Sequence, residues 1–240
     1  MKDGVVYGVK PVLESLRGGR TPRELFIHES RTDRRLEEIL SAARERGVPV
    51  RFRASTDLER LAGTSHHQGV VLWTEPFRYA DLSLLPDHAS LVVLLDSIQD
   101  PHNLGAIIRT AACAGAAMVV ITKDRACPVT PTVEKCSAGG VETVPVARVT
   151  NLADTIDQLK KRGFWVYGAD AGAGQGLYDV SFGEKTAIVI GSEGEGIRPL
   201  VRRRCDLLVS IPLSGGVASL NASVAAAVIL FEVVRQRRTG

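Results

Sequence analysis

Three polar residues open one of the most apolar segments of the chain. Residues 211–232 read IPLSGGVASLNASVAAAVILFE, and Ser219, Asn221 and Ser223 fall in the first turn of the helix predicted there. A helix that is apolar on every side belongs in a core, whereas a helix N-terminus offers unpaired backbone N–H groups and partial positive charge. The strand-like residues 211–213, the Ser-Gly-Gly turn after them and this polar helix start together predict a site for a small polar ligand.

A second candidate is the glycine-rich segment 191–197, GSEGEGI, which follows the apolar run 186–190. Its glycines have the spacing GxxGxG, unlike the GxGxxG of dinucleotide-binding turns, and Glu193 and Glu195 are ill suited to cradling a pyrophosphate. Glycine permits close approach of the backbone to a ligand. The segment therefore disfavours a dinucleotide site and suits a cationic or hydroxyl-bearing ligand.

A third candidate is residues 100–116, DPHNLGAIIRTAACAGA, which place Asn103 at a predicted helix start and Arg109 six residues later. They follow residues 91–97, LVVLLDS, a continuous apolar run typical of a central parallel strand.

Other motifs carry less weight. The histidines of HHQGV at 66–70 are interpreted as part of a turn or an RNA-facing edge, because adjacent strand residues point to opposite faces. The glycine-rich segment 168–176 is predicted to be a flexible surface loop. No CxxC spacing occurs among the four cysteines, which favours reduced core thiols over a metal site or disulfides.

Alternating strands and helices must position these candidates. An alternation of this kind predicts a mostly parallel sheet covered by helices on both faces, with ligands at the carboxyl ends of its strands. The expected strands are 91–97, 118–122, 143–147, 164–168 and 186–190, and the expected helices between them include 131–137 and 151–162.

The front of the chain reads as a separate, smaller α/β unit. Its expected helices are 7–17, 32–46 and a short one after 55–57, and its expected strands are 23–28, 48–53 and 69–73. We therefore expect a first domain at 1–75, a linker at 76–88 and a second domain at 89–240.

Composition sets the broad class. The chain has 240 residues, of which 45% are hydrophobic and 24% charged, as in ordinary globular proteins. Its apolar runs are too short to cross a bilayer and its first residues lack the pattern of a signal peptide, so a cytoplasmic protein is expected. The net charge of +3 is mild, but arginines cluster in residues 17–53 and 198–204, which favours a nucleic-acid partner.

Taken in chain order, residues 100–116, 188–197 (IVIGSEGEGI) and 211–232 resemble, with matching internal spacing, the three motifs of the SpoU-type branch of the SPOUT superfamily, the RNA 2′-O-ribose methyltransferases. Residues 1–75 resemble the L30e-like RNA-binding domain that precedes the catalytic domain in the guanosine-2′-O-methyltransferases acting on 23S rRNA. The resemblance implies an α/β fold with a deep trefoil knot, S-adenosylmethionine as cofactor and a homodimer. It implies RNA as the partner, and neither DNA nor a membrane.

The same resemblance implies roles for individual residues, with no metal among them. The cofactor site would be lined largely through backbone groups, by Gly191, Ile211 and Leu220 together with Ser219 and Asn221. The catalytic positions would be Asn103, Arg109, Glu193, Ser219 and Asn221. The family mechanism makes the arginine matching Arg109 the proton acceptor, yet a guanidinium is not normally deprotonated in proteins. We expect Arg109 instead to hold a phosphate and to stabilise charge on the 2′-oxygen.

The implied reaction is methylation of a ribose 2′-hydroxyl, with a guanosine of 23S rRNA as target. Two alternatives stay open. One is methylation of tRNA by the same fold, against which the L30e-like front domain argues. The other is a non-catalytic ribosomal RNA-binding protein, which would leave Asn103, Arg109 and Asn221 without a reason to occur together.

Overall fold

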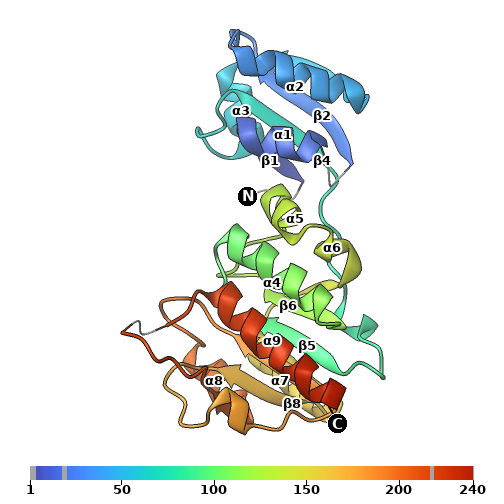
Figure 1. The fold of residues 1–240 in the computed structure, drawn as a ribbon. Coiled ribbons are helices and arrows are strands. Elements are labelled where there is room, and N and C mark those ends of the chain that lie inside the picture. Colours follow the sequence, from blue (N-terminus) through green and yellow to red (C-terminus); the bar gives the residue numbers. More distant parts are fainter. Residues whose placement is uncertain (1–3, 18–20, 217–218, 240) are drawn as a thin grey trace. The chain divides into compact units, whose positions relative to one another are not determined.

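The computed structural model describes residues 4–17, 21–216 and 219–239 (Figure 1). The chain divides into two compact units. The first comprises Met1–Arg78 with Val129–Lys135, and the second comprises Tyr79–Pro128 with Cys136–Gly240. A short later segment thus joins the first unit, where Lys135 Nζ lies 2.7 Å from Glu14 Oε1.

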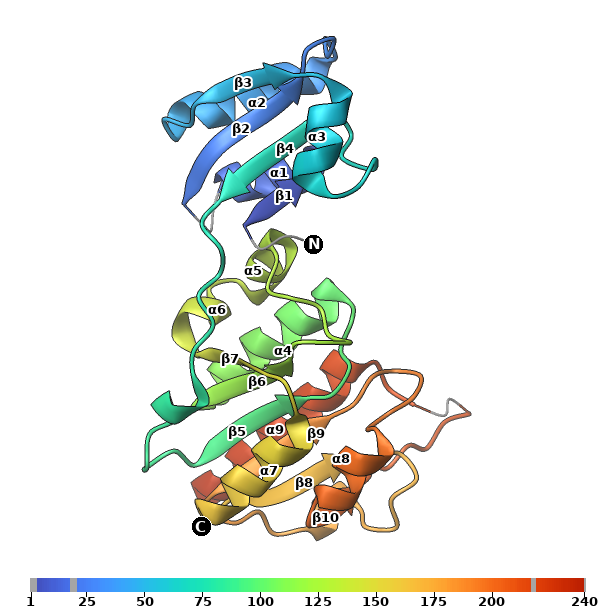
Figure 2. The same ribbon diagram turned by 180° about the vertical axis from the view of Figure 1, so that it is seen from behind.

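The first unit is built on a four-stranded sheet in the order β1-β4-β2-β3. Strands β2 and β3 run parallel, and the other two pairs are antiparallel. Figures 1 and 2 show α1 and α2 on one face of this sheet and α3 against the other. The elements are β1 (Val5–Tyr7), α1 (Val9–Arg17), β2 (Pro22–His28), α2 (Arg34–Glu45), β3 (Val50–Arg53), α3 (Ser55–Ala62) and β4 (Val70–Thr74).

Amphipathic patterning explains these elements. Helix α2 begins at a cap in which the Asp33 side chain accepts a hydrogen bond from Arg35 N, and it buries Ile39, Ala42 and Ala43 against the sheet. The helices and strands predicted for this unit are confirmed with small shifts at their ends. Strand β1 was not predicted, because three residues are too few to show an alternation.

The second unit contains a six-stranded sheet in the order β10-β8-β9-β5-β6-β7, and all its strand pairs are parallel. Helices α4 and α9 lie on one face (Figure 1), and α7 and α8 on the other (Figure 2). The predicted parallel sheet with helices on both faces is therefore confirmed. The strands are β5 (Leu91–Leu95), β6 (Met118–Thr122), β7 (Val146–Val149), β8 (Trp165–Ala169), β9 (Thr186–Ile190) and β10 (Leu207–Val209). Its helices are α4 (Pro101–Cys113), α6 (Gly140–Thr143), α7 (Leu152–Lys161), α8 (Pro199–Arg204) and α9 (Ala222–Thr239), with short 3-10 turns η1 (Leu82–Leu84) and η2 (Leu177–Asp179). Helix α5 (Pro131–Ser137) lies mostly in the later segment that belongs to the first unit.

Strand β5 is central, with β9 and β6 as its neighbours, and all five of its residues are buried. One core layer packs α7 and α8 against the sheet through residues such as Ile156, Leu159 and Val201. Because every strand runs in the same direction, the carboxyl ends of β5, β8 and β9 meet at one edge of the sheet. Among the described residues, no helix is both long and apolar enough to span a membrane.

Two local predictions were wrong, and a third had its start misplaced. Residues 211–213 form no strand. The pairing of β10 with β8 ends at Val209, and Pro212 has no N–H to donate. Helix α9 begins at Ala222, so Ser219 precedes the helix instead of lying in its first turn. The strand predicted at 143–147 also begins later, at Val146, because α6 occupies the residues before it.

Candidate active site

A tight turn follows β9. Ser192 N donates to Gly196 O at 3.1 Å, and Gly196 N donates to Ser192 O at 3.0 Å. Gly196 adopts a φ of +66°, a conformation that favours glycine. At Gly191 an added Cβ would lie 2.2 Å from the carbonyl carbon of Gly196, so the turn folds back directly onto the backbone of the strand end. We call residues 191–197 the glycine turn.

The glycine turn carries Glu193 into a hydrogen-bonded cluster with two asparagines. Asn103 Nδ2 donates to Glu193 Oε1 at 2.8 Å, and Asn221 Nδ2 donates to Asn103 Oδ1 at 2.9 Å. Asn221 Nδ2 also donates to Glu193 Oε1. The structure therefore brings together one residue from each of the three candidate segments, in what we call the amide–carboxylate cluster.

Each asparagine is held by a helix start. Asn103 lies in the first turn of α4, which begins with Pro101 after an Asp100 cap that accepts a hydrogen bond from His102 N at 2.9 Å. Asn221 precedes α9, and its Oδ1 accepts hydrogen bonds from Ser223 N at 2.9 Å and Val224 N at 3.3 Å. The side-chain oxygen of Asn221 thus caps α9, while its side-chain nitrogen donates the hydrogen bonds of the cluster.

Arg109 lies outside this cluster. Six residues along α4 correspond to about 9 Å of rise and a rotation of about 240°, so Arg109 and Asn103 lie on different faces of the helix. Arg109 is exposed, and its guanidinium forms no hydrogen bond or ion pair with any residue of the described ranges. The backbone of Arg109 is closely covered by α6, since a Cβ at Gly140 would lie 3.0 Å from Arg109 Cα.

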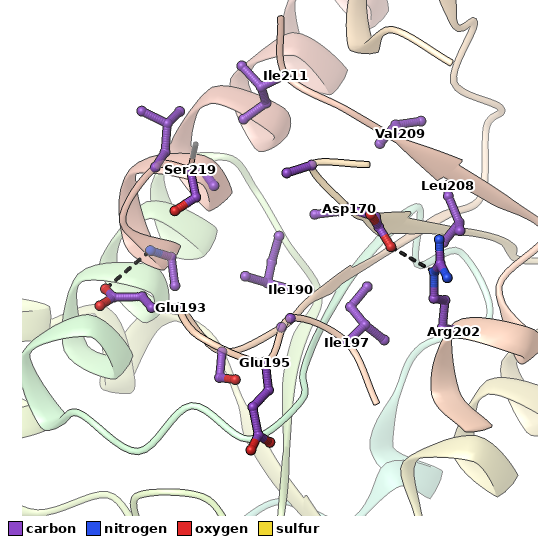
Figure 3. Close-up of a pocket in the computed structure, with 18 of the residues that line it drawn as sticks. Asp170, Ile190, Glu193, Glu195, Ile197, Arg202, Leu208, Val209, Ile211 and Ser219 are labelled. Carbon is purple, nitrogen blue, oxygen red and sulfur yellow. Dashed lines mark hydrogen bonds and ion pairs between the residues drawn. The ribbon is translucent and has the colours of Figure 1, made fainter. Parts of the chain in front are cut away.

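A cavity of about 930 Å³ opens beside the glycine turn (Figure 3). This volume lies in the range of small-molecule sites. Five of the predicted site residues line it, namely Gly191, Glu193, Ile211, Ser219 and Leu220, whereas Asn103, Arg109 and Asn221 do not. The apolar part of the wall includes Ile190, Leu208 and Val209.

The far side of the cavity carries an ion pair that the sequence did not reveal. Arg202 Nε lies 2.7 Å from Asp170 Oδ2, and Figure 3 shows this pair across the cavity from Glu193 and Ser219. Asp170 follows the last residue of β8. Because ligands sit at the carboxyl ends of parallel strands, its position just after a predicted strand could have identified Asp170 as a site residue.

The prediction that residues 168–176 form a flexible surface loop was wrong. Ala169, Asp170 and Ala171 line the cavity. The rest of the segment is tied to the end of β10, because Ser210 N donates to Gln175 O at 2.9 Å and Leu177 N donates to Ser210 O at 2.7 Å. Asp170 Oδ1 also accepts a hydrogen bond from Gly172 N at 2.8 Å.

Two cysteine thiols near the sheet, Cys127 (buried) and Cys205 (half-buried), stay neutral. Burial raises the pKa of Cys205 to about 12 and that of Cys127 to about 11. The Cys205 Sγ packs under the start of the 168–176 segment, 3.0 Å from the position of a Cβ at Gly168. Neither thiol is suited to act as a nucleophile at neutral pH.

Comparisons with protein families cover almost the whole chain. Residues 90–231 match the SpoU rRNA methylase family, and residues 5–80 match the RNA 2′-O ribose methyltransferase substrate-binding family. The 23S rRNA (guanosine-2′-O-)-methyltransferase RlmB of Ralstonia nicotianae is 44% identical over 241 residues, which cover 98% of this chain and 97% of that protein. YacO of Bacillus subtilis, assigned to the TrmH family of tRNA/rRNA methyltransferases, is 40% identical over 97% of this chain and 95% of its own length.

Solved structures agree with this match. The SpoU methyltransferase AviRb of Streptomyces viridochromogenes, crystallised in complex with AdoMet, superposes with a TM-score of 0.67 at 29% sequence identity. That alignment covers 98% of this chain and 91% of AviRb.

Proposed function

The chain belongs to the SpoU rRNA methylase family, and on this premise we propose that it binds S-adenosylmethionine in the cavity beside the glycine turn and methylates ribose 2′-hydroxyls of RNA. The observation that carries the proposal is the amide–carboxylate cluster. It joins Asn103, Glu193 and Asn221 at the rim of a cavity of about 930 Å³.

The residues around the cavity fit this cofactor. S-adenosylmethionine has an apolar and aromatic body with positive charge at its sulfonium and amino groups. Apolar side chains such as Ile190 and Val209 form the wall, and the carboxylates of Asp170, Glu193 and Glu195 border it. Gly191 and Gly196 let the turn close tightly at the edge of the cavity, because the backbone of Gly196 fills the space that a Cβ at Gly191 would need. The trefoil knot implied by the resemblance remains part of the proposal.

Positioning accounts for most of the proposed catalysis. When bound, the cofactor supplies an electrophilic methyl group for in-line displacement by a ribose oxygen, which must approach within about 3 Å. Both hydrogen-bonding ends of the Asn103 amide are engaged, so the amide orientation is fixed and the carboxylate of Glu193 is held with it. Ser219, exposed beside the cavity, has a hydroxyl available for the substrate or the cofactor.

Arg109 is proposed to act on the RNA and not on the proton. Its exposed guanidinium is suited to bidentate contact with a phosphate next to the reacting ribose and to stabilising the developing charge on the 2′-oxygen. Loss of the hydroxyl proton is then assisted by a neighbouring group or by water.

We further propose a guanosine of 23S rRNA as the target, a homodimer as the active form, and the cytoplasm as its compartment. The 44% identity to an RlmB protein supports the target, and the match of residues 5–80 to a substrate-binding family supports a front domain at 1–75 that recognises RNA. Val224 and Phe231 lie two helical turns apart on α9 and are 47% and 49% exposed, which leaves an apolar strip for a second subunit.

The test has two steps, the first with the purified protein and the second with RNA from cells. Calorimetry with S-adenosylmethionine should show one binding site per chain. The Asn221→Ala substitution should lower the affinity for the cofactor. Mapping of 2′-O-methyl groups on rRNA and tRNA from cells lacking the gene, with and without its reintroduction, should then reveal one missing guanosine methylation in 23S rRNA. A site missing only from tRNA would overturn the proposed target, and absence of cofactor binding would favour the non-catalytic alternative.

A further inference from the structure

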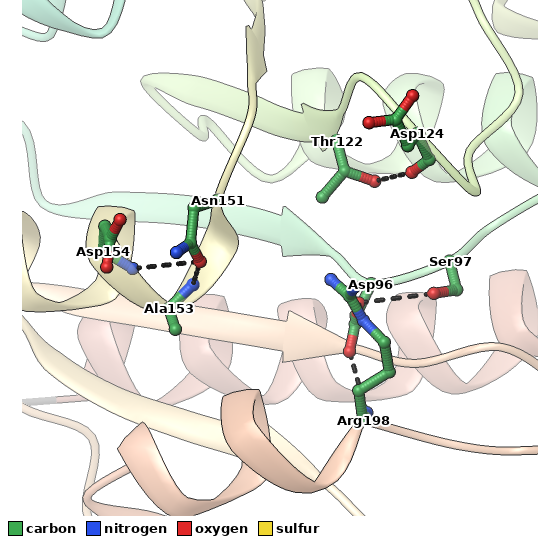
Figure 4. A network of polar contacts seen from close by, with 8 residues as sticks. All are labelled: Asp96, Ser97, Thr122, Asp124, Asn151, Ala153, Asp154 and Arg198. Carbon is green, nitrogen blue, oxygen red and sulfur yellow. Dashed lines mark hydrogen bonds and ion pairs between the residues drawn. The ribbon is translucent and has the colours of Figure 1, made fainter.

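Asp96 is a buried carboxylate at the carboxyl end of β5 that none of the preceding roles uses. It is 0% exposed. Its Oδ2 accepts a hydrogen bond from Arg198 N at 2.8 Å, and its Oδ1 accepts one from Arg198 Nε at 2.6 Å (Figure 4). A fully buried charge is tolerated only when it is paired and hydrogen-bonded, and Arg198 satisfies both requirements.

The position of these contacts along the chain gives Asp96 its significance. The glycine turn, residues 191–197, begins after Ile190 and ends before Arg198. Asp96 N donates to Ile190 O at 2.8 Å, while the Asp96 carboxylate accepts the N–H of Arg198. The residue that directly follows β5 therefore holds both the entry and the exit of the turn.

The same residue also leads into the first candidate segment. Directly after Asp96 the chain turns at Ser97, which is buried and has a φ of +64°, and its Oγ lies 3.4 Å from Asp96 Oδ1. From there it reaches Asp100 and the start of α4, which carries Asn103. The geometry of Asp96 thus fixes the relative placement of Asn103 and Glu193, the two residues joined by the 2.8 Å hydrogen bond of the amide–carboxylate cluster.

We propose that Asp96 is a positioning residue that clasps the glycine turn by its two ends and thereby sets the geometry of the cofactor site. This inference rests on the proposed function for its effect on cofactor binding. The clasp itself is a property of the chain and can be measured without any ligand.

The chain offers a matched control at the opposite end of the sheet. Asp206 Oδ2 accepts a hydrogen bond from Val166 N at 2.8 Å, and its Oδ1 pairs with Lys160 Nζ at 2.7 Å. This carboxylate also joins one backbone N–H and one cation, but Val166 lies near the start of β8 and Asp206 does not line the cavity. Asp206→Ala removes a similar set of contacts without touching the glycine turn.

The experiment measures hydrogen exchange of the backbone amides in peptides that contain residues 192–198, by mass spectrometry on the full-length protein without ligand. Asp96→Ala should accelerate exchange in these peptides about tenfold, because the exit of the turn loses its acceptor. Asp206→Ala should leave their exchange unchanged, even if it lowers the thermal midpoint of unfolding equally. Equal exchange in wild type and Asp96→Ala, or equal acceleration by both variants, would overturn the proposal.

Two further variants guard against loss of folding. Asp96→Asn keeps an oxygen that can accept the Arg198 N–H, and Arg198→Gln keeps the N–H itself, so each should give a smaller acceleration of about threefold. Calorimetry with S-adenosylmethionine is run in parallel, and the dissociation constant should rise in the same order as the exchange rate. If wild type binds no cofactor, the proposed function fails while the exchange rates still decide whether Asp96 clasps the turn.

Discussion

Two glycine-rich segments follow neighbouring parallel strands, and they are built in different ways. The glycine turn after β9 closes on itself through two backbone hydrogen bonds and a glycine with no room for a Cβ. Segment 168–176 after β8 is instead held by side chains and by the end of β10, through the Asp170–Arg202 pair and the contacts of Ser210. Both border the same cavity.

The difference teaches which features define a site in such a sheet. The position at the carboxyl end of a parallel strand decides whether a segment reaches the cavity. The glycine pattern decides how rigidly it is shaped there. We therefore expect substitutions in the glycine turn to act strongly and those in segment 168–176 to act weakly.

The largest effect is expected from Gly191→Ala. Its Cβ would lie 2.2 Å from a backbone carbon, so the turn must move, and overpacking of this kind costs about 1–3 kcal/mol or more. We expect the dissociation constant for S-adenosylmethionine, measured by calorimetry, to rise by about 100-fold or more. Gly174→Ala in segment 168–176 is the matched control, because no heavy atom lies within 4 Å of its added Cβ. Similar affinities of the two variants for the cofactor would contradict the expected difference between the glycine turn and segment 168–176.

A smaller loss is expected from Glu193→Gln. The carboxylate accepts hydrogen bonds from Asn103 and Asn221, and replacing a charged acceptor by a neutral amide weakens each of them. Loss of about 2 kcal/mol corresponds to a methyl-transfer rate about 30-fold lower, measured in single turnovers with saturating cofactor. A rate within twofold of wild type would show that the cluster does not position the reaction.

Cys205 tests whether segment 168–176 stays packed over the sheet. Since the thiol has its pKa raised to about 12 in the folded chain, it remains protonated at pH values where the unfolded chain has lost the proton. The free energy of unfolding must then fall as pH rises above about 9, by about 1 kcal/mol per pH unit more in wild type than in Cys205→Ser. Urea unfolding at pH 8, 9 and 10 measures this difference. Parallel pH profiles would mean that water reaches the thiol beneath the segment.

Asp170→Asn should have the smallest effect. The partner Arg202 is about half exposed, and ion pairs of this kind contribute about 0–1 kcal/mol. The dissociation constant for S-adenosylmethionine should rise about threefold, again by calorimetry, with no change in thermal midpoint beyond a few degrees. A loss of affinity as large as that of Gly191→Ala would mean that segment 168–176 contributes as much to cofactor binding as the glycine turn.

Much of this architecture could be predicted from local pattern. The buried strands β5, β6 and β9 are continuous apolar runs, and the glycine turn and both asparagines have distinctive spacing in the sequence. Asp170 and Asp96 could not be identified in the same way. Each pairs with a residue far along the chain: Asp170 with Arg202 and Asp96 with Arg198. Neither pairing produces a periodic pattern in the sequence.

Position within a helix could likewise not be read from composition. The sequence suggested that Ser219 and Asn221 share one turn, but α9 starts after both of them. The rotation of Arg109 away from Asn103, in contrast, could have been deduced from the spacing of six residues in a helix.

The position of Asn221 near the end of the chain has a consequence for when the cluster can form during synthesis. The cluster joins residues that are 90 and 118 positions apart, and its last member lies close to the end of the chain. Contacts of such long range form late, and chains fold as they emerge from the ribosome at about 5–20 residues per second. The amide–carboxylate cluster is therefore completed only after Asn221 has been synthesised and α9 has docked, so a chain stopped before residue 219 lacks one of its three members. The hydrogen bond from Asn221 to Asn103 then reports that synthesis has passed residue 221.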